Sequence, residues 1–342
     1  MERIIVLGGK GGVGKSSISA ATAVRLSDLL PDKKVLVISF DMAHNLSDLF
    51  LTEIGNKLTQ LTEAGNLWGI EPDPNIYAEE YTRTLIEKMK NLMKRMPLVG
   101  MIPQIEEFID TTFTADSIPL ALKNAMFFQK ILDAEDVSQE ILFDIIVVDM
   151  PPTGNMLALF EIPEDQIKVV LKYSLNFYNS IRGAIKNVGK MFRKFITPFA
   201  DDKKRRELGV EILNMVQDLE KRGERITQLI HDIGSLRLVT IAEKPSFEEI
   251  KRARELTKKY ISIDGVHVNM LIPAHVANNC DFCKTMYTTQ QKYLEEISQE
   301  FDTLKIWESV KLVKEPIGIE GLRELAKEVY KESSLAKDIV YP

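Results

Sequence analysis

The chain has 342 residues, of which 45% are hydrophobic and 27% are charged, so it can bury a large core and is globular rather than disordered. Its 44 Lys and Arg against 50 Asp and Glu give a formal net charge of −6, which excludes a uniformly basic surface for binding nucleic acid. No apolar run approaches the roughly 18 residues that span a bilayer, and no signal-peptide pattern opens the chain. We therefore expect a cytoplasmic protein.

Short, continuous apolar runs alternate with helical patterns along much of the chain. The runs predict strands that are buried on both faces of a parallel sheet, at residues 4–7, 35–39, 145–149, 236–242 and 266–269. Helices are predicted between and after them, at residues 17–30, 246–260 and 319–331. This alternation predicts an α/β fold with a doubly wound, mostly parallel sheet.

The segment GGKGGVGKSS, residues 8–17, lies between the first predicted strand and the first predicted helix. That context fits a phosphate-binding loop of the form G-x-x-x-x-G-K-[ST], in which backbone N–H groups and a helix N-terminus surround the phosphates of ATP. Lys15 would neutralise the β- and γ-phosphates, and the hydroxyl of Ser16 would coordinate Mg²⁺. The other residues of this loop that we expect to contact ATP are Gly9, Lys10, Gly11, Gly12, Val13, Gly14 and Ser17.

Lys10 is one lysine more than such a loop needs. Its place on the tight turn predicts a side chain that projects outward, toward the nucleotide of a second copy of the chain, instead of adding to Lys15. A cation supplied by a partner subunit can raise the rate of phosphoryl transfer by about 10³–10⁵. The alternative is an ordinary solvated loop lysine.

Two acidic residues follow predicted strands. Asp41 comes after the strand at 35–39, at the carboxyl edge of the sheet, where it could position or deprotonate the water that attacks the γ-phosphate. His44 is the alternative base. Asp149 ends the strand at 145–149 and precedes Pro-Pro-Thr-Gly, which makes it the candidate Walker B acid; the alternative is a simple strand-end cap.

Two stretches, residues 76–134 and 164–232, lack a convincing strand and carry apolar residues at helical spacing. We interpret them as a helical subdomain inserted into one ATPase domain, which residues 1–75, 135–163 and 233–342 would form. Methionine can line a surface that accepts many apolar sequences, although core filling is the alternative. Seven methionines fall in these stretches: Met89, Met93, Met96, Met101, Met126, Met191 and Met215.

Cys280 and Cys283 are the only cysteines, and they have C-x-x-C spacing. In a reducing compartment such a pair favours metal binding or redox activity over a structural disulfide. A structural zinc takes four ligands, so two copies of the chain would complete one Zn²⁺ site. The alternatives are a site completed by His267 or His275 in the same chain, a redox dithiol, and inert thiols.

Four motifs occur in order: GKGGVGKS, DMAHNLSD, DMPPTG and CDFC. Together they resemble the tail-anchored-protein targeting ATPases, relatives of the arsenite-pump ATPases in the deviant Walker A class, over residues 4 to about 325. The resemblance implies a homodimeric ATPase that uses ATP, Mg²⁺ and Zn²⁺. It also implies that helices of both subunits hold the transmembrane helix of a tail-anchored protein and deliver it to a membrane receptor.

The resemblance also assigns roles to single residues. It implies that Lys10 reaches the nucleotide of the opposite subunit, that Asp41 is the catalytic acid of switch I and that Asp149 begins switch II. Glu243 and Asn269 match residues that contact nucleotide, Asn269 through the adenine. The sequence departs from the family pattern near 312–318, so the adenine contacts there stay open.

Three other functions remain alternatives on the sequence alone. They are an arsenite-pump-type ATPase subunit, a non-enzymatic holdase that exposes apolar surface, and a partitioning or division-site ATPase. A partitioning ATPase would lack the helical insertions and the cysteine pair. The arsenite-pump family spaces its cysteines otherwise and usually fuses two ATPase halves.

Overall fold

The computed structural model describes residues 1–41, 45–73, 143–153, 228–277, 280–331 and 335–342, together with a few isolated positions between 75 and 156. By its contacts the chain divides into two compact units. The first consists of Met1–Asp73, Ala134–Phe160 and Gln228–Pro342, and the second of Pro74–Asp133 and Glu161–Thr227. Nearly all of the second unit, which corresponds to the expected helical insertions and holds their seven methionines, lies outside the described residues.

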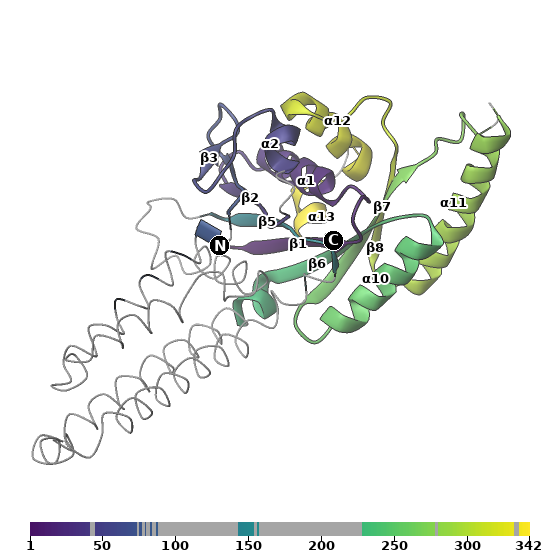
Figure 1. Cartoon of the computed structure of the whole chain (residues 1–342), viewed down its shortest axis with the longest axis horizontal. Helices are drawn as coiled ribbons and strands as arrows, with labels where there is room; N and C mark the ends of the chain where they lie inside the picture. The colour runs from purple at the N-terminus through teal and green to yellow at the C-terminus, as the bar shows by residue number, and fades with distance from the viewer. Residues whose placement is uncertain are drawn as a thin grey trace, which may run out of the picture. The chain divides into compact units, whose positions relative to one another are not determined.

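An eight-stranded sheet forms the centre of the first unit (Figure 1). Its strands lie in the order β3-β4-β2-β5-β1-β6-β7-β8. Neighbouring strands are parallel throughout, except that β3 and β4 are antiparallel. The sheet confirms the predicted doubly wound α/β fold. The strands are β1 (Arg3–Gly9), β2 (Val35–Ser39), β3 (Thr59–Gln60), β4 (Leu67–Ile70), β5 (Ile145–Asp149), β6 (Gly234–Ile241), β7 (Ser262–Leu271) and β8 (Lys305–Val310).

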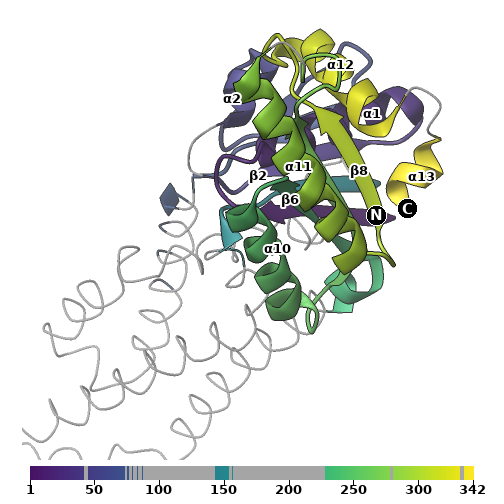
Figure 2. The ribbon, with the colours of Figure 1, turned by 90° about the vertical axis from the view of Figure 1, so that its right-hand side faces the viewer.

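The described helices cover both faces of this sheet. One face carries α1 (Lys15–Leu29), α2 (Asn45–Phe50), α12 (Gly318–Tyr330) and α13 (Ala336–Val340), and the other carries α10 (Lys244–Thr257) and α11 (Asp281–Glu300). Figure 2 looks onto α10, α11 and the edge strand β8. Every residue of β2 and of β5 is buried, as continuous apolar strands between two helical layers require. Within the described segments, no helix combines the length and the apolarity needed to cross a membrane.

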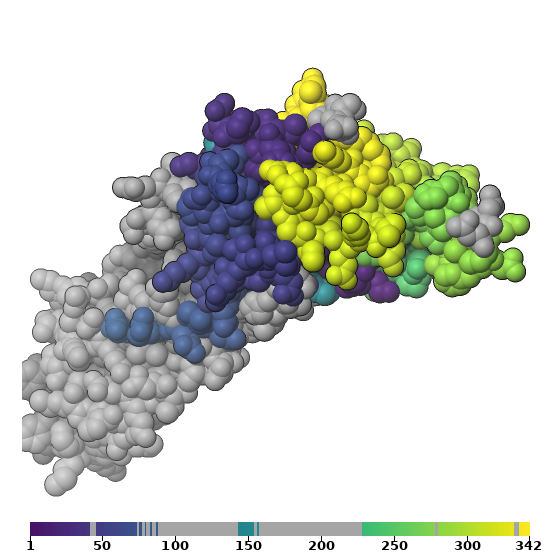
Figure 3. Space-filling model, turned by 90° about the horizontal axis from the view of Figure 1, so that it is seen from above, coloured from purple at the N-terminus to yellow at the C-terminus, as the bar shows by residue number. Residues whose placement is uncertain are grey.

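Helix α1, which follows the glycine loop, is held in place by the C-terminal helices. It is rich in small residues, and Ala20, Ala21 and Ala23 are completely buried, so neighbouring elements can approach it closely. The hydroxyls of Thr22 in α1 and Tyr330 in α12 lie 2.6 Å apart and form a buried hydrogen bond. On the face shown in Figure 3, the yellow C-terminal segment meets the purple to blue N-terminal segment. The end of the chain therefore fixes the helix on which the loop rests.

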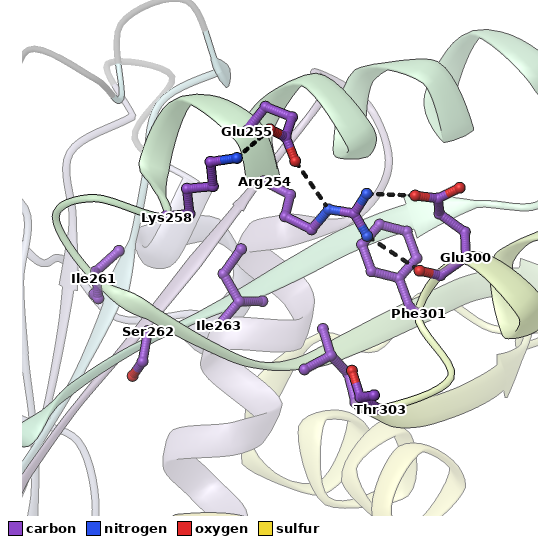
Figure 4. Close-up of a pocket in the computed structure, with 10 residues that line it drawn as sticks. Arg254, Glu255, Lys258, Ile261, Ser262, Ile263, Glu300, Phe301 and Thr303 are labelled. Atoms are coloured by element: carbon purple, nitrogen blue, oxygen red, sulfur yellow. Dashed lines mark hydrogen bonds and ion pairs between the residues drawn. The ribbon is translucent and has the colours of Figure 1, made fainter.

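A pocket of about 250 Å³ opens where the ends of α10 and α11 meet the start of β7 (Figure 4). Arg254 lines this pocket, donates a hydrogen bond to the carbonyl of Glu300 at 3.1 Å and pairs with the carboxylate of the same residue. Its guanidinium group also lies 4.8 Å from the ring centre of Phe301. The charge of Arg254 thus joins α10 to α11. Because β7 begins here, this pocket lies at the amino ends of the parallel strands, whereas the glycine loop lies at their carboxyl ends.

Candidate nucleotide site

The loop between β1 and α1 depends on glycines at fixed points. Gly9, Gly12 and Gly14 have φ angles of 154°, 81° and 89°, in the region that side chains rarely adopt. A Cβ on Gly9 would lie 2.1 Å from the carbonyl oxygen of Val239 in β6. Gly14 is the N-cap of α1 and is left-handed. The loop therefore packs against the neighbouring strand and turns directly into the helix, the geometry that surrounds a phosphate.

Lys15, the first residue of α1, folds back over this loop. Its Nζ donates a hydrogen bond to the carbonyl of Lys10 at 3.1 Å, and its side chain is buried. Burial lowers the pKa of Lys15, whereas the negative charges of Asp149 and Asp41 raise it. A phosphate group in the loop would add negative charge beside this ammonium group and offset the cost of its burial.

Lys10 takes part in this loop through its backbone. Lys10 is exposed, while its backbone oxygen accepts the hydrogen bond from Lys15. Within one chain, the loop already has Lys15 for its phosphates. The exposure of Lys10 is compatible with a contact to a second copy of the chain, and that contact stays a prediction.

Asp149 is completely buried at the end of β5, between β1 and β2. The hydroxyl of Ser39 donates a hydrogen bond to its Oδ2 at 2.9 Å, and that of Ser19 donates to Oδ1 at 3.4 Å. Burial raises the pKa of Asp149 to about 6, although hydrogen bonds from Ser16 and Ser39 and the charge of Lys15 lower it. The sequence places an acid here, and the structure surrounds it with hydroxyl groups.

The surroundings of Asp149 fit a magnesium ion. The hydroxyl of Ser16 hydrogen-bonds to this carboxylate, and hydroxyl and carboxylate oxygens are the ligands that Mg²⁺ prefers in phosphate sites. Ser16, with Asp149 behind it, would hold the ion at the start of α1. When bound, Mg²⁺ supplies positive charge to the phosphate oxygens.

Asp41 lies two residues beyond β2 and is half-buried. Its N–H donates a hydrogen bond to the hydroxyl of Ser39 at 3.2 Å, and its charge acts on both Lys15 and Asp149. The structure therefore brings Asp41 to the glycine loop, at the carboxyl edge of the sheet. His44, the alternative base, lies outside the described residues.

The segment that runs from Asp41 to α2 is held at its α2 end by a carboxylate that the sequence did not reveal. Glu71 follows β4 directly and is buried. It accepts hydrogen bonds from the N–H of Leu46 at 2.8 Å, and from the N–H and hydroxyl of Ser47 at 3.1 and 2.7 Å. The first turn of α2 is thereby fixed to β4. An acid directly after a buried strand was the signal in the sequence, the same one that pointed to Asp149.

Asn269 and Glu243 lie at the carboxyl ends of the neighbouring strands β7 and β6. Asn269 lies near the end of β7 and is buried, and its Nδ2 donates a hydrogen bond to the carbonyl of Val13 at 3.0 Å. Its Oδ1 accepts one from the hydroxyl of Ser309 at 2.9 Å. Glu243 is half-buried at the N-cap of α10. The structure thus places Asn269 against the glycine loop itself, with Ser309 as a partner that the sequence analysis did not find.

The cysteine pair begins α11. Cys280 is the N-cap, and its Sγ accepts a hydrogen bond from the N–H of Cys283 at 3.2 Å. The two sulfur atoms are 3.1 Å apart. That N–H group and the Cys283 thiol lower the pKa of Cys280, while the hydrogen bond to Cys280 raises the pKa of Cys283. The thiols are accessible and close enough to bind one metal ion together.

No third ligand joins this pair within the described residues. No group of three or more His, Cys, Asp and Glu side chains is placed there to hold a metal ion. His267, one of the two histidines considered, is buried and stacks on Trp307 with ring centres 4.5 Å apart. The pair therefore supplies two of the four ligands that a structural zinc needs, and the other two would come from elsewhere.

A doubly wound sheet with a glycine loop, a buried lysine at the helix start and a buried acid on the adjacent strand defines a P-loop nucleotide-hydrolysing protein. A family model described as "Anion-transporting ATPase" matches residues 2–331. The chain belongs to this family and is an ATPase. This confirms the resemblance drawn from the four motifs. It also sets aside the purely non-enzymatic holdase.

Relatives of two kinds match nearly the whole chain. "ATPase GET3" of Debaryomyces hansenii is 28% identical over 355 residues, which cover 98% of this chain and 93% of the relative. "Putative arsenical pump-driving ATPase" of Prosthecochloris vibrioformis is 30% identical over 350 residues, which cover 99% and 78%. "Putative arsenical pump-driving ATPase 2" of Aquifex aeolicus is 31% identical over 332 residues, which cover 95% and 98%. Sequence similarity alone does not separate the two kinds.

Proposed function

We propose that this ATPase is a cytoplasmic homodimer that binds the transmembrane helix of a tail-anchored membrane protein and releases it to a membrane receptor after ATP hydrolysis. We propose a homodimer because two sites of the chain are incomplete on their own. Lys10 is exposed on a loop whose phosphates Lys15 would already neutralise, and Cys280 and Cys283 offer two ligands where a zinc needs four. A second copy of the chain completes both.

The hydrolytic part of the proposal uses seven residues. Lys15 and the N–H groups of the loop bind the phosphates of ATP, and Ser16 and Asp149 hold the magnesium ion that accompanies them. Asp41 orients the attacking water, because phosphoryl transfer depends mainly on position and on charge stabilisation. Lys10 of the partner subunit adds positive charge on the open side of the site. Glu243 and Asn269 complete the proposed nucleotide contacts.

The cargo part of the proposal rests on the sequence motifs, on the relatives named ATPase GET3 and on the apolar residues at helical spacing in the stretches 76–134 and 164–232. Unbranched, polarisable methionine side chains suit a groove that must accept many apolar helices. The run of basic residues in the second stretch would meet an acidic receptor segment or cover the cargo: Arg182, Lys186, Lys190, Arg193 and Lys194.

Co-expression with a tagged tail-anchored protein tests this function. We expect the two proteins to co-purify, and we expect no capture of a matched cargo whose transmembrane helix is replaced by a polar linker. Addition of Mg²⁺ and ATP should release the cargo from the wild-type chain more rapidly than from Asp41→Asn. Failure to capture the intact cargo would refute the proposal.

An ATPase subunit of the arsenite-pump type is the second candidate, because relatives named arsenical pump-driving ATPase match this chain at 30–31% identity. The same preparation distinguishes the two functions. Hydrolysis that rises with added arsenite, in a protein that captures no transmembrane helix, would favour the pump. A rate of hydrolysis that does not change with added arsenite, in a protein that captures the transmembrane helix, would favour the targeting of tail-anchored proteins.

A further inference from the structure

The pairing of β7 with β8 shifts beside the glycine loop. Val268 pairs with Glu308, but the next pair joins Leu271 to Val310, so β7 carries one residue more than β8 in this interval. Within the interval Met270 has a φ of 59°, a left-handed conformation that is rare for a residue with a side chain. Such bulges redirect side chains and occur often beside active sites. A strained residue of this kind persists only where its surroundings hold it.

Helix α11 holds the bulge from one side. The side chain of Gln290 is buried, its Oε1 accepts a hydrogen bond from the N–H of Ile272 at 2.7 Å, and its Nε2 donates one to the carbonyl of Met270 at 3.2 Å. A bulge removes backbone groups from the ladder of the sheet, and buried groups without partners are costly. Gln290 provides those partners at the point where β7 is irregular.

The side chain of Asn269, which lies in the bulge, contacts the glycine loop. Its two hydrogen-bond partners determine which side of the amide group is the nitrogen and which is the oxygen. The carbonyl of Val13 can only accept a hydrogen bond, so the nitrogen of the amide must face it, at 3.0 Å. The oxygen of the amide then faces Ser309, whose hydroxyl must donate, at 2.9 Å. Asn269 is 5% exposed and Ser309 is 2% exposed. Water therefore does not compete for these bonds.

The loop is shaped to receive this amide. A Cβ on Gly14 would lie 2.4 Å from Nδ2 of Asn269, so Asn269 occupies the space that a side chain at position 14 would need. Val13 and Gly14 come directly before Lys15, and the peptide groups they form carry N–H groups of the phosphate cradle. A shift of the Val13 carbonyl would turn the next N–H group away from the phosphate.

We propose that Ser309 and Gln290 are positioning residues that hold the glycine loop in its phosphate-binding form through Asn269. This inference rests on the proposed binding of nucleotide by the loop. It differs from an adenine contact by Asn269 in one measurable respect. A contact with the base matters only to ligands that have a base, whereas a clamp on the loop acts on the phosphates of any ligand.

Binding of ADP and of inorganic pyrophosphate, each with Mg²⁺, tests the clamp without recourse to hydrolysis. We expect Ser309→Ala to weaken both ligands to a similar degree, roughly tenfold, since a buried amide oxygen loses its donor. Ser309→Thr keeps the hydroxyl and should restore both affinities. Ser235→Ala is the matched control, because Ser235 is also buried in a strand and its hydroxyl has no hydrogen-bond partner among the described residues.

The adjacent glutamines of α11 give a second test. Gln290 is buried and holds the bulge, while Gln291 is exposed. We expect Gln290→Leu to weaken ADP and pyrophosphate together and Gln291→Leu to weaken neither. The thermal unfolding midpoint without ligand shows that each variant is folded; if Gln290→Leu is not, the Ser309 series decides alone.

Each result has a definite meaning. A loss confined to ADP would place Asn269 and its partners on the base and overturn the clamp, as would unchanged binding of both ligands by Ser309→Ala. Failure of the wild-type chain to bind either ligand would instead overturn the proposed nucleotide site, and the clamp with it.

Discussion

The hydroxyl of Ser39 donates a hydrogen bond to Oδ2 of Asp149 at 2.9 Å. The two residues end the neighbouring strands β2 and β5, where they are register partners. The same hydroxyl accepts a hydrogen bond from the N–H of Asp41 at 3.2 Å. One buried side chain thus connects the acid expected to hold the magnesium ion with the segment that carries the candidate catalytic acid.

Ser39→Ala should slow hydrolysis while leaving the affinity for ATP close to that of the wild-type chain. Lys15 and the glycine loop remain intact, but the segment of Asp41 loses one of its attachments, so we expect kcat to fall roughly tenfold. Ser39→Thr should retain most of the activity because it keeps the hydroxyl. Ser27→Ala is the control, since that buried hydroxyl donates its hydrogen bond within its own helix, to the carbonyl of Val24. An unchanged kcat in Ser39→Ala would show that this connection has no part in turnover.

Asp41→Asn keeps the size of the side chain and removes its charge. If Asp41 orients or deprotonates the attacking water, turnover should fall roughly 10²–10⁴-fold while ATP still binds. Steady-state hydrolysis and nucleotide binding measure the two effects separately. Asp48→Asn, an exposed acid on α2, should behave like the wild-type chain. Near-normal hydrolysis by Asp41→Asn would transfer the catalytic role to His44.

The strands that the sequence predicted are those in which burial on both faces leaves a continuous apolar run. β2 and β5 are entirely buried, and their sequences contain nothing that interrupts the pattern. β8 was not predicted, because Lys305 and Glu308 are exposed in this edge strand and break the apolar run. α11 was also missed; of its 20 residues only Gln290 and Ile297 are buried, so few of its side chains belong to the core.

At the nucleotide site too, the sequence reveals only those residues that belong to a recognisable pattern. Lys15, Asp41 and Asp149 are recognisable because each stands at a fixed place after a strand or within a spaced motif. Ser309 and Gln290 are single polar residues whose partners lie on other elements, and no spacing in the sequence marks them. Their contacts depend on a shift of register between β7 and β8, which only the three-dimensional structure shows.

The ring of His267 should make the protein sensitive to acid. It stacks on Trp307, meets the edge of Tyr330 and is close to Arg237, which is paired with Asp264. Burial, with a further effect of the Arg237 charge, lowers the pKa of His267 well below its ordinary value of 6.5. As the pH falls below about 6.5, the unfolded chain therefore takes up a proton that the folded chain does not. This group lowers the free energy of unfolding by at most about 1.4 kcal/mol per pH unit in that range.

His267→Phe keeps an aromatic ring against Trp307 and removes the titrating group. We expect the loss of stability between about pH 6.5 and pH 5 to become smaller, by up to about 1.4 kcal/mol per pH unit. Urea unfolding followed by tryptophan fluorescence measures it. His231, whose side chain is 74% exposed, provides the control His231→Gln, which should leave the pH dependence unchanged. Equal pH dependence in the wild-type chain and His267→Phe would contradict the assignment.

Replacing both Cys280 and Cys283 by Ser removes the thiolate ligands of the proposed shared zinc. We expect the molar mass in solution, measured without nucleotide, to fall toward that of the monomer, while binding of ADP persists because Lys15 and the N–H groups of the glycine loop are unchanged. The wild-type protein should contain about one zinc per two chains. One zinc in every chain, or a dimer that the double substitution leaves intact, would show that the site is not shared.

Lys10→Ala tests whether this lysine acts on the neighbouring subunit. The variant should bind nucleotide almost normally, because Lys15 and the loop N–H groups are intact, but it should hydrolyse ATP poorly. A cation supplied from a partner can contribute about 10³–10⁵ in rate, so the loss should be large. Lys57→Ala, which removes an exposed lysine elsewhere on the first unit, should have no such effect.

Mixing Lys10→Ala with Asp41→Asn distinguishes action on the partner from action within one chain. In a mixed dimer, one site keeps its own Asp41 and receives Lys10 from the Asp41→Asn subunit, while the other site lacks both groups. If Lys10 acts across the dimer and the two sites work independently, a mixture of two inactive proteins should recover measurable hydrolysis. If Lys10 acts within its own chain, each site lacks one group and the mixture stays inactive.

Pull-down through a tag on one variant must first show that mixed dimers form. An inactive mixture of proven heterodimers would then exclude two independent sites completed by Lys10 of the partner subunit.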